Sequence, residues 1–501
     1  IEDNLSDGER IVRDIKRVIG SDNIRIPYSI YRRLQEIIRK SDFDVTFTIR
    51  KHEDSYELIK VDNGRNTNMY GLCVDIGTTT VAACLVDLVT EEIKSSANSG
   101  NLQMQYGADV ISRIIYSTKP GGLERLKECI VNGTINQLIE RMLGELSITK
   151  DDIVCSVFAG NTTMTHLFLG VDAQNIRLEP YIPAFKIAPD VKAKDIGLSI
   201  NPEAPVFLLP NVASYVGGDI VSGVLAAGFW KDGRNTLFLD LGTNGEIVFG
   251  NAEWMLTCAC SAGPAFEGGE ISCGMRAAVG AIDQVKIDKR TFEPSFSVIA
   301  GVKPKGICGS GLIDLMAEMF ISGIIDSKGK IIRHGKTKRI RKNTSLDCHE
   351  YVVVWGEDSA DGRDIAINEI DIDNFLRAKG AVYSAIRTLL KNVSMNEGDI
   401  DRVIIAGGIG QNLDIKNSII IGMLPDIDPG KFEFIGNSSL TGAYACLISD
   451  DARSKAMEIS ESMTYIELSA DPDYMGEFIG ACFLPHTDIN LFPSTKKAAN
   501  I

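Results

Sequence analysis

The sequence lacks the features of a membrane, secreted or iron–sulfur protein. Its 501 residues contain no long hydrophobic run, and apolar stretches such as residues 220–230 fall far short of the roughly 20 residues that span a bilayer. The 11 cysteines are scattered, without a C-x-x-C pair, zinc-ligand spacing or the C-x4-C-x2-C spacing of an iron–sulfur cluster. The first residues do not resemble a secretory signal peptide. These absences exclude an integral membrane protein and predict free thiols in a cytoplasmic protein.

Positive charge is also scarce. Lys and Arg total 52 against 67 Asp and Glu, which gives a formal net charge of −15 at pH 7. A chain with this balance repels a phosphate backbone, so we expect neither nucleic acid nor a membrane among its partners. The rest of the composition, with 44% hydrophobic and 24% charged residues, is that of an ordinary globular protein, and the length predicts about three domains.

The first 68 residues predict a small region of mixed structure. Ser6 and Glu9 have the spacing of a capping box, and apolar residues follow at helical period. A second helix is predicted over residues 28–40, and apolar and polar residues alternate over residues 43–49 as in a half-buried strand. We therefore expect a linker helix in residues 1–22 and a small α+β domain in residues 23–68.

From residue 69 onward, one pattern occurs twice. Each copy has an apolar strand ending in D-x-G-T, a second strand, a helix, a third strand and a turn that contains glycine. The D-x-G-T turn, the helix and the third strand lie at residues 75–78, 123–146 and 154–159 in the first copy, and at 240–243, 370–393 and 402–406 in the second. The repeat predicts a first lobe over 69–232 and a second over 233–455, with an insertion at about 251–365. Residues 456–501 are expected to form an irregular extension packed on this core.

The D-x-G-T turns have the chemistry of a polyphosphate site. Glycine lets the backbone approach a phosphate, the following N–H and hydroxyl groups are donors, and the Asp at the strand end can hold Mg²⁺ through water. A single turn of this kind is common, but two in a duplicated frame indicate a nucleotide site. We therefore predict Asp75 and Asp240 as metal ligands with a catalytic role. The predicted nucleotide contacts are Gly77, Thr78, Thr79, Thr80, Asn161, Thr162, Gly242, Thr243, Asn244, Gly245, Ser310, Gly407, Gly408 and Gly410.

Several other side chains have two possible roles. Asp219 is either the catalytic base that activates water or the N-cap of a helix, and Glu246 either acts at the second turn or points away along its strand. Ser310 and Asp314 either line a ribose pocket or cap a helix. The simpler interpretation is favoured for the remaining motifs: buried thiols over metal ligands for Cys258, Cys260, Cys273 and Cys308, a structural role for His486, and a solvated loop over a docking surface for the basic run at 328–342.

The paired turns resemble the phosphate motifs of the actin-like ATPase superfamily, and Ile404-Ile-Ala-Gly-Gly408 resembles its adenosine motif. Within that superfamily the chain is similar to the reductive activators of corrinoid proteins. The similar stretches include Val74-Asp-Ile-Gly-Thr-Thr-Thr-Val81, Ala159-Gly-Asn-Thr-Thr-Met164, Ser261-Ala-Gly-Pro-Ala-Phe-Glu-Gly268 and Phe483-Leu-Pro-His-Thr487. The resemblance implies an α/β fold, with a duplicated actin-like (ribonuclease H-like) ATPase core of two lobes and a small N-terminal α+β domain.

The same resemblance implies an enzyme, an ATPase that drives the uphill reduction of an inactive Co(II) corrinoid protein to Co(I). The implied cofactors are ATP and Mg²⁺, and a two-iron two-sulfur cluster is expected only in an N-terminal domain missing from this chain. The implied partners are a corrinoid protein in its Co(II) form, an electron donor protein and a second copy of the chain in a homodimer. The alternatives are an actin-like small-molecule kinase and a nucleotide-switched binding module. An activator of an acyl-CoA dehydratase is disfavoured, because the cysteine spacing gives it little support.

Overall fold

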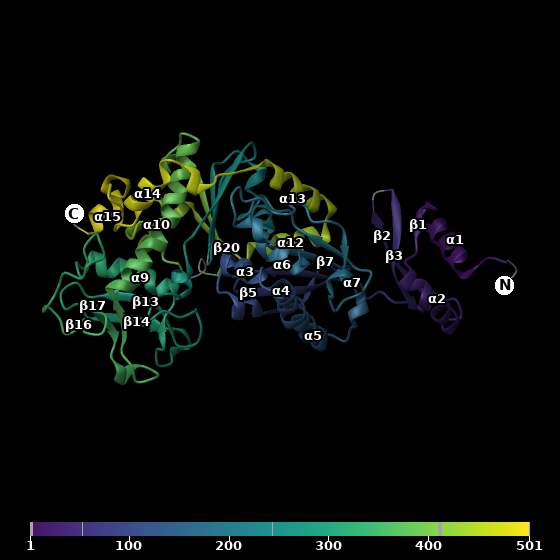
Figure 1. Ribbon diagram of the computed structural model, residues 1–501, viewed down its shortest axis with the longest axis horizontal. Coiled ribbons are helices and arrows are strands. Elements are labelled where there is room, and N and C mark those ends of the chain that lie inside the picture. The colour runs from purple at the N-terminus through teal and green to yellow at the C-terminus, as the bar shows by residue number, and fades with distance from the viewer. Residues whose placement is uncertain (1–3, 53, 243, 409–412, 500–501) are drawn as a thin grey trace. The chain divides into compact units, whose positions relative to one another are not determined.

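The computed structural model describes residues 4–52, 54–242, 244–408 and 413–499 (Figure 1). The chain divides into two compact units. Unit 1 comprises Ile1–Ser222 and Ser439–Met457, and unit 2 comprises Gly223–Ser438 and Glu458–Ile501. In the described ranges, no helix has both the length and the apolar character that a membrane crossing requires. The finer domain limits expected from the sequence stay a prediction.

The first elements of unit 1 are those predicted from the sequence. Helix α1 (Asp7–Ile19) begins at the expected capping box, in which the Ser6 side chain accepts from the Glu9 N–H and the Glu9 side chain accepts from the Ser6 N–H. It ends at Gly20, whose φ of 75° favours glycine. Helix α2 (Tyr28–Lys40) shares an apolar core with α1 and with a sheet of order β1-β3-β2. Those strands are β1 (Ile24–Arg25), β2 (Val45–His52) and β3 (Ser55–Asn63).

The main sheet of unit 1 has the strand order β6-β5-β4-β7-β9-β8. Strand β4 pairs antiparallel with β5 and parallel with β7, while β5 pairs antiparallel with β6 and β7 pairs parallel with β9. The strands are β4 (Tyr70–Ile76), β5 (Thr80–Asp87), β6 (Ile93–Gly100), β7 (Ile153–Gly160), β8 (Val191–Lys192) and β9 (Pro205–Leu208). Buried Lys60 on β3 pairs with Asp152 at 2.6 Å and so ties the small sheet to the rest of unit 1.

The other helices of unit 1 are grouped around this main sheet (Figure 1). They are α3 (Val110–Ser117), α4 (Gly122–Ile130), α5 (Asn136–Glu145), α6 (Thr162–Leu169), α7 (Ala193–Ile196), α8 (Gly218–Ala227), α12 (Ser438–Ile448) and α13 (Asp450–Ser462), of which α8, α12 and α13 cross the unit limits in sequence. The helical stretch expected over 123–146 is present as α4 and α5, which continue into each other through a π-helical turn, η2 (Val131–Ile135). Such turns insert one residue into the helical repeat without ending the helix.

The main sheet of unit 2 repeats this topology, which confirms the duplicated actin-like core. Its order is β20-β19-β10-β11-β12-β21, with β10, β11, β12, β19 and β20 in the places of β4, β5, β6, β7 and β9. The strands are β10 (Thr236–Leu241), β11 (Gly245–Gly250), β12 (Met255–Cys260), β19 (Arg402–Ala406), β20 (Phe432–Gly436) and β21 (Met463–Tyr465). A repeated sequence pattern has thus folded into a repeated sheet.

The remaining elements of unit 2 surround its large core. Two small sheets have the orders β14-β13-β15 and β16-β17-β18. Their strands are β13 (Ala281–Ile287), β14 (Pro294–Val298), β15 (Gly306–Ile307), β16 (Ile340–Asn343), β17 (Cys348–Val354) and β18 (Ile365–Asn368). The helices are α9 (Gly309–Ile321), α10 (Glu369–Asn392), α11 (Ile415–Ile420), α14 (Tyr474–Ala481) and α15 (Pro493–Ala498). The expectation of an irregular C-terminal segment was therefore wrong, because α13, β21, α14 and α15 give it regular structure.

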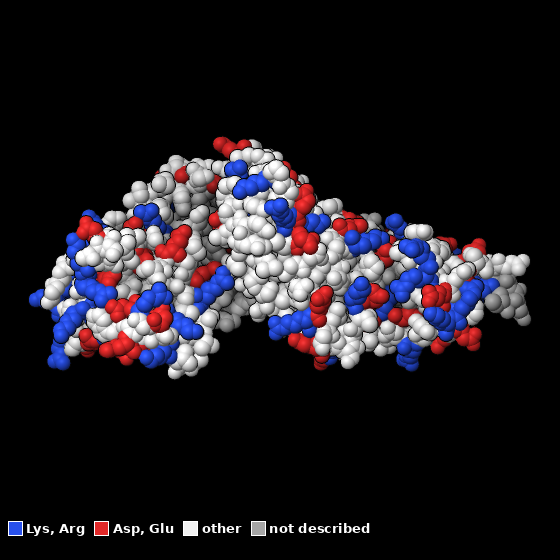
Figure 2. All heavy atoms as spheres, turned by 60° about the horizontal axis from the view of Figure 1, so that its bottom comes forward, with Lys and Arg blue, Asp and Glu red and all other residues white. Residues whose placement is uncertain are grey.

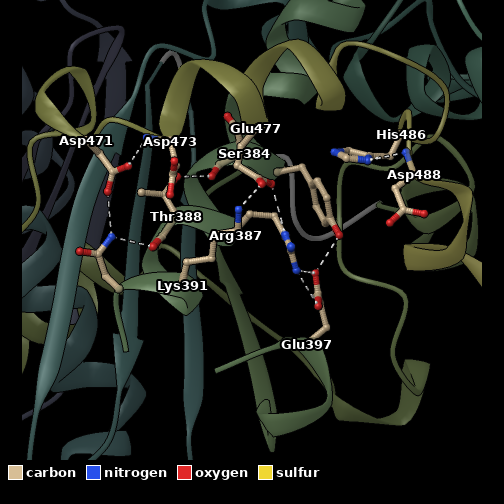
Figure 3. A network of polar contacts seen from close by, with 12 residues as sticks. Ser384, Arg387, Thr388, Lys391, Glu397, Asp471, Asp473, Glu477, His486 and Asp488 are labelled. Atoms are coloured by element: carbon tan, nitrogen blue, oxygen red, sulfur yellow. Dashed lines mark hydrogen bonds and ion pairs between the residues drawn. The ribbon is translucent and has the colours of Figure 1, made fainter. Parts of the chain in front are cut away.

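Helix α14 is held on α10 by a network of charged side chains (Figure 3). Arg387 on α10 donates to both carboxylate oxygens of Glu397, at 2.8 and 3.1 Å, and to Glu477 on α14 at 3.3 Å. Lys391 also donates to Glu477, and Tyr383 donates to Glu397 at 2.9 Å. Tyr474, Phe478 and Ala481 on α14 also pack against the unit 2 core, so this helix is held by apolar burial together with ion pairs to a distant part of the chain.

The strand period places both predicted metal ligands on the same side of their sheets. In β4, Leu72, Val74 and Ile76 enter the core that carries α4 and α5, so Asp75 projects from the opposite face. In β10, Leu237, Leu239 and Leu241 enter the unit 2 core, and Asp240 projects from the opposite face in the same way.

Candidate active site

The first D-x-G-T turn joins β4 to β5 at the end of the unit 1 sheet. Asp75 is half-buried there, and Ser439 Oγ donates a hydrogen bond to its Oδ1 at 2.8 Å. Gly77 leaves no space for a side chain, because a Cβ at this position would overlap the carbonyl oxygen of Thr80, the exposed first residue of β5. Only glycine therefore permits the tight shape of the turn.

The carbonyl groups of this turn are bonded inside the protein. Asn101 Nδ2 donates to Gly77 O at 3.0 Å, and the Asn101 backbone N–H donates to Thr79 O at 2.9 Å. Arg113 Nη2 donates to Thr78 O at 2.6 Å. Carbonyl oxygens carry partial negative charge and would repel a phosphate. Because all three carbonyl groups are bonded within the protein, the outer side of the turn is suited to bind an anion.

Asn161 connects the turn to α6. Because β7 runs parallel to β4, with Gly160 opposite Ile76, the residue after β7 lies beside the turn. Asn161 Oδ1 caps α6 by accepting from Met164 N at 2.9 Å, and Asn161 Nδ2 donates to Thr78 Oγ1 at 3.0 Å. One side chain thus fixes both the helix start and the buried Thr78 hydroxyl.

The loop before α8 packs on the same helix start. Thr162 Oγ1 donates to Ala213 O at 2.5 Å, and a Cβ on Gly217 would overlap the Asn161 backbone. Asp219 follows as the second residue of α8, so it is not the N-cap, and its Oδ1 accepts from Ile220 N at 2.9 Å. Unit 1 therefore brings Asp75, the first turn, Asn161, Thr162 and Asp219 into one neighbourhood.

Asp240 has in unit 2 the place that Asp75 has in unit 1. It lies opposite Glu246 on antiparallel β11 and opposite Ala406 on parallel β19. Residues directly opposite each other on paired strands project from the same face, so buried Glu246 shares the face of Asp240. Gly407 follows with a φ of 87°, and a Cβ on it would lie 2.9 Å from Asp240 Oδ1.

The second turn is closed by a backbone bond in which Gly242 N–H donates to Asn244 O at 3.0 Å. Gly245 then begins β11. Glu267 belongs to the same surroundings, because its Oε1 lies 3.8 Å from the position that a Cβ on Gly242 would take. Gly408, after β19, is exposed with open space around it. The predicted contacts Thr243 and Gly410 lie outside the described residues.

A pocket of about 600 Å³ lies in unit 2 beside α9 and α11. Asp314 is buried in its wall, where Asn417 Nδ2 donates to it at 2.7 Å, and burial raises the pKa of Asp314 to about 6. Ser310 Oγ donates to Asp283 O at 3.0 Å, and the N-cap of α9 is Cys308, so neither Ser310 nor Asp314 caps the helix. The pocket is lined by Gln284, Val285, Lys286, Ser295, Phe296, Ser297, Asp314, Leu413, Asp414 and Asn417.

The other motifs occupy structural positions. Cys258, Cys260 and Cys308 are buried and Cys273 is half-buried, and burial raises the pKa of Cys260 to about 12. The ring of His486 lies near Tyr383 and Phe492, and its Nδ1 accepts from Asp488 N (Figure 3). The described residues contain no group of three or more His, Cys, Asp or Glu that could hold a metal ion.

The basic run at 328–342 is partly neutralised where it enters β16. Arg339 pairs with Glu293 at 2.7 Å, and Arg341 pairs with Glu350 at 2.6 Å and with Asp364 at 2.7 Å. On the face drawn in Figure 2, basic and acidic side chains are mixed in the same way.

Comparison with known proteins accounts for almost the whole chain. Three family models match in sequence order: the RACo linker region at residues 1–68, the RACo middle region at 70–232, and the C-terminal domain of RACo, the ASKHA domain, at 234–496. The chain belongs to the RACo family. The order of the three matches follows the order of the elements described above.

Two curated relatives and a solved structure resemble this chain along most of its length. The corrinoid activation enzyme RamQ of Eubacterium limosum is 31% identical over 93% of this chain and 79% of its own. The [Co(II) methylated amine-specific corrinoid protein] reductase of Methanosarcina barkeri is 23% identical over 79% of this chain and 73% of its own. A solved structure described as a reductive activator for corrinoid,iron-sulfur protein is 46% identical and covers 99% of this chain and 78% of its own, with a TM-score of 0.88.

Sequence reasoning missed four residues of the site. Asn101 and Arg113 hold the first turn from behind, Ser439 donates to Asp75, and Glu267 lies beside the second turn. Arg113 had a signal in the sequence, since it is a lone charge among apolar residues at helical spacing. Glu267 lies in the family-like stretch 261–268, but its distance from Gly242 along the chain hides their proximity.

Proposed function

We propose that this chain is an ATP-dependent reductive activator that returns an inactive Co(II) corrinoid protein to Co(I). The observation that carries the proposal is the pair of matching Asp–glycine turns on a duplicated actin-like core, in a family whose relatives are described as a corrinoid activation enzyme and a corrinoid protein reductase. The ASKHA fold implies nucleotide binding. ATP binding and hydrolysis drive the conformational change that makes the uphill electron transfer possible.

The described residues fit ATP with Mg²⁺. Asp75 in unit 1 and Asp240 in unit 2 each offer the hard oxygen ligands that Mg²⁺ prefers. Gly77 and Gly407, which lie next to them, have no side chain that would keep a phosphate from the backbone. When bound, Mg²⁺ neutralises phosphate charge and orders the polyphosphate. The turns after these two aspartates bind phosphate oxygens, and Asn161 holds Thr78 in place for that contact. The pocket beside α9 receives the nucleoside, with Asp314 in its wall.

Three carboxylates are candidates for activating the attacking water. Asp219 lies beside the first turn, and Glu246 and Glu267 lie beside the second. Replacing each by its amide keeps the size of the side chain and removes the base. The variant that retains ATP binding but loses at least about a hundredfold in hydrolysis identifies the catalytic group, a loss within the range expected for general-base catalysis.

The proposed partners are the corrinoid protein in its Co(II) form and a protein that donates electrons, and the proposed assembly is a homodimer. The descriptions of the relatives support the corrinoid partner. The electron donor and the homodimer follow only from the family resemblance. Sedimentation of the purified chain distinguishes a monomer from a dimer directly.

The test is ATP hydrolysis by the purified chain with a corrinoid/iron–sulfur protein prepared as Co(II), Co(I) or methyl-Co(III). We expect hydrolysis to rise with the Co(II) form alone. With a low-potential artificial reductant present, visible absorption should show Co(I) forming only when ATP is added. The control is Asp240→Asn, which should abolish both signals.

Two outcomes contradict the proposal. Equal hydrolysis with all three cobalt states means that the chain does not sense the metal. Phosphate transfer from ATP to a small acceptor, without stimulation by Co(II) protein, identifies a kinase. A repeat with a methylamine-specific corrinoid protein separates the wrong partner from the wrong function.

A further inference from the structure

Arg113 is fully buried directly behind the first D-x-G-T turn. It lies on α3, and its side chain is 0% exposed. Its guanidinium donates to Thr78 O at 2.6 Å, to Gly107 O at 2.9 Å and to Gln103 Oε1 at 3.3 Å. Every one of these acceptors is neutral, so the arginine is bonded on several sides without meeting a negative charge.

A buried cation without a counter-ion is unfavourable. Among the described residues no carboxylate lies within ion-pair distance of Arg113, and Asp109, at the N-cap of α3, acts on it only from further away. Burial accordingly lowers the pKa of Arg113 to about 10, which still leaves it charged at neutral pH. A neutral residue of similar size would avoid this desolvation cost, so the charge calls for a counterpart outside the resting protein.

The position of Arg113 identifies that counterpart. The guanidinium bonds the carbonyl of Thr78, on the inner side of a turn whose carbonyl oxygens all point inward. We propose that Arg113 is the positioning residue of the first phosphate turn. Its positive charge, acting through the turn, attracts the negatively charged polyphosphate of the bound nucleotide. This proposal rests on the proposed function, and it adds a residue that makes the affinity for a nucleotide depend on the charge of its polyphosphate.

The proposal predicts an effect that grows with the charge of the ligand. Two unit charges about 7 Å apart, at an effective dielectric constant of about 20, attract strongly enough to change an affinity by roughly tenfold to fiftyfold. Loss of the Arg113 charge should therefore weaken MgATP most and MgADP less, and leave adenosine unchanged. A purely structural arginine would show no such order.

The first test is Arg113→Met in the full chain, with MgATP, MgADP and adenosine measured by calorimetric titration and folding followed by thermal unfolding. The matched control is Arg125→Met on α4, an exposed arginine that should bind all three ligands as the unmodified chain does. We expect Arg113→Met to weaken MgATP at least tenfold. Folded Arg113→Met that binds MgATP within twofold of the unmodified chain, or that loses all three ligands equally, overturns the proposal.

A second variant tests the charge without removing the arginine. Gln103→Glu places a carboxylate at the guanidinium, whereas Gln105→Glu makes the same change at an exposed site of the same 3₁₀ helix, η1 (Leu102–Tyr106). Gln103 Nε2 also donates to Leu126 O at 2.9 Å, so Gln103→Glu loses that bond and some thermal stability as well. In the folded Gln103→Glu chain the internal counter-ion should still weaken MgATP binding at least tenfold, and Gln105→Glu should not weaken it. Unchanged MgATP affinity in folded Gln103→Glu refutes the role of Arg113. If the unmodified chain itself fails to bind MgATP, it is the proposed function that fails.

Discussion

Asn161 makes two separate contacts, so different substitutions of this residue are expected to change either the stability of the chain or its affinity for nucleotide. Its Oδ1 caps α6 and its Nδ2 holds the Thr78 hydroxyl. In Asn161→Ala both bonds are lost. The cap contributes about 1 kcal/mol and the hydrogen bond to a buried hydroxyl about another 1 kcal/mol, so the free energy of unfolding should fall by about 2 kcal/mol.

Asn161→Asp should behave differently. Aspartate caps a helix as well as asparagine does, and the Thr78 hydroxyl can turn to donate to the new carboxylate, so stability should stay within about 0.5 kcal/mol. The added negative charge, however, lies beside the phosphate turn. At about 6–7 Å from a phosphate and an effective dielectric constant of about 20, it costs about 2–3 kcal/mol, or on the order of 30- to 150-fold in MgATP affinity.

Urea unfolding and calorimetric titration of MgATP measure the two quantities on the same preparations. The control is Asn396→Asp, in which the same change is made at the exposed cap of η9 (Glu397–Asp399), where Asn396 Oδ1 accepts from Gly398 N at 2.9 Å. It should alter neither quantity appreciably. A stable Asn161→Asp chain with unchanged MgATP affinity would show that the phosphate does not bind at this turn.

Three further predictions concern unit 2. Gly407→Ala should lose at least about 1–2 kcal/mol of stability and most MgATP binding, because alanine is strained at a φ of 87° and its Cβ would press on Asp240, the predicted metal ligand. Gly408→Ala, in open space, should keep its stability in the same urea unfolding assay. Asp314 has a folded pKa of about 6, above its unfolded value. Its ionisation therefore opposes folding above about pH 6, and that cost falls away as the pH falls below about 4. Asp314→Asn should gain up to about 3 kcal/mol relative to the unmodified chain at pH 7.5 and about half as much at pH 5. Arg387→Met leaves two half-buried carboxylates without their guanidinium and should cost about 2–3 kcal/mol, while Lys391→Met, at a more exposed site, should cost under about 1 kcal/mol in the same urea assay.

Much of the fold could be read locally. The capping box at Ser6, the alternation over residues 43–49, the apolar runs of β4 and β10, and the helical period of α2 and α10 involve residues within a few positions of one another. The C-terminal helices were not predicted, because α14 has only eight residues and is held on α10 both by ion pairs and by the packing of Tyr474 and Phe478 against the unit 2 core. Its stabilising partners lie about 90 positions earlier in the chain.

The amino-acid sequence is enough to predict the duplicated D-x-G-T frame, the glycines at 77 and 407, and the two aspartates, because each follows from the chemistry of a strand end and its adjoining turn. The residues that surround them are set by the packing of distant segments. Arg113, Asn161 and Ser439 reach the first turn from 35, 83 and 364 positions away along the chain. Hydrogen bonds between such distant residues leave no periodic signal in the sequence, since they exist only once β4, β7, α3 and α12 have packed against one another.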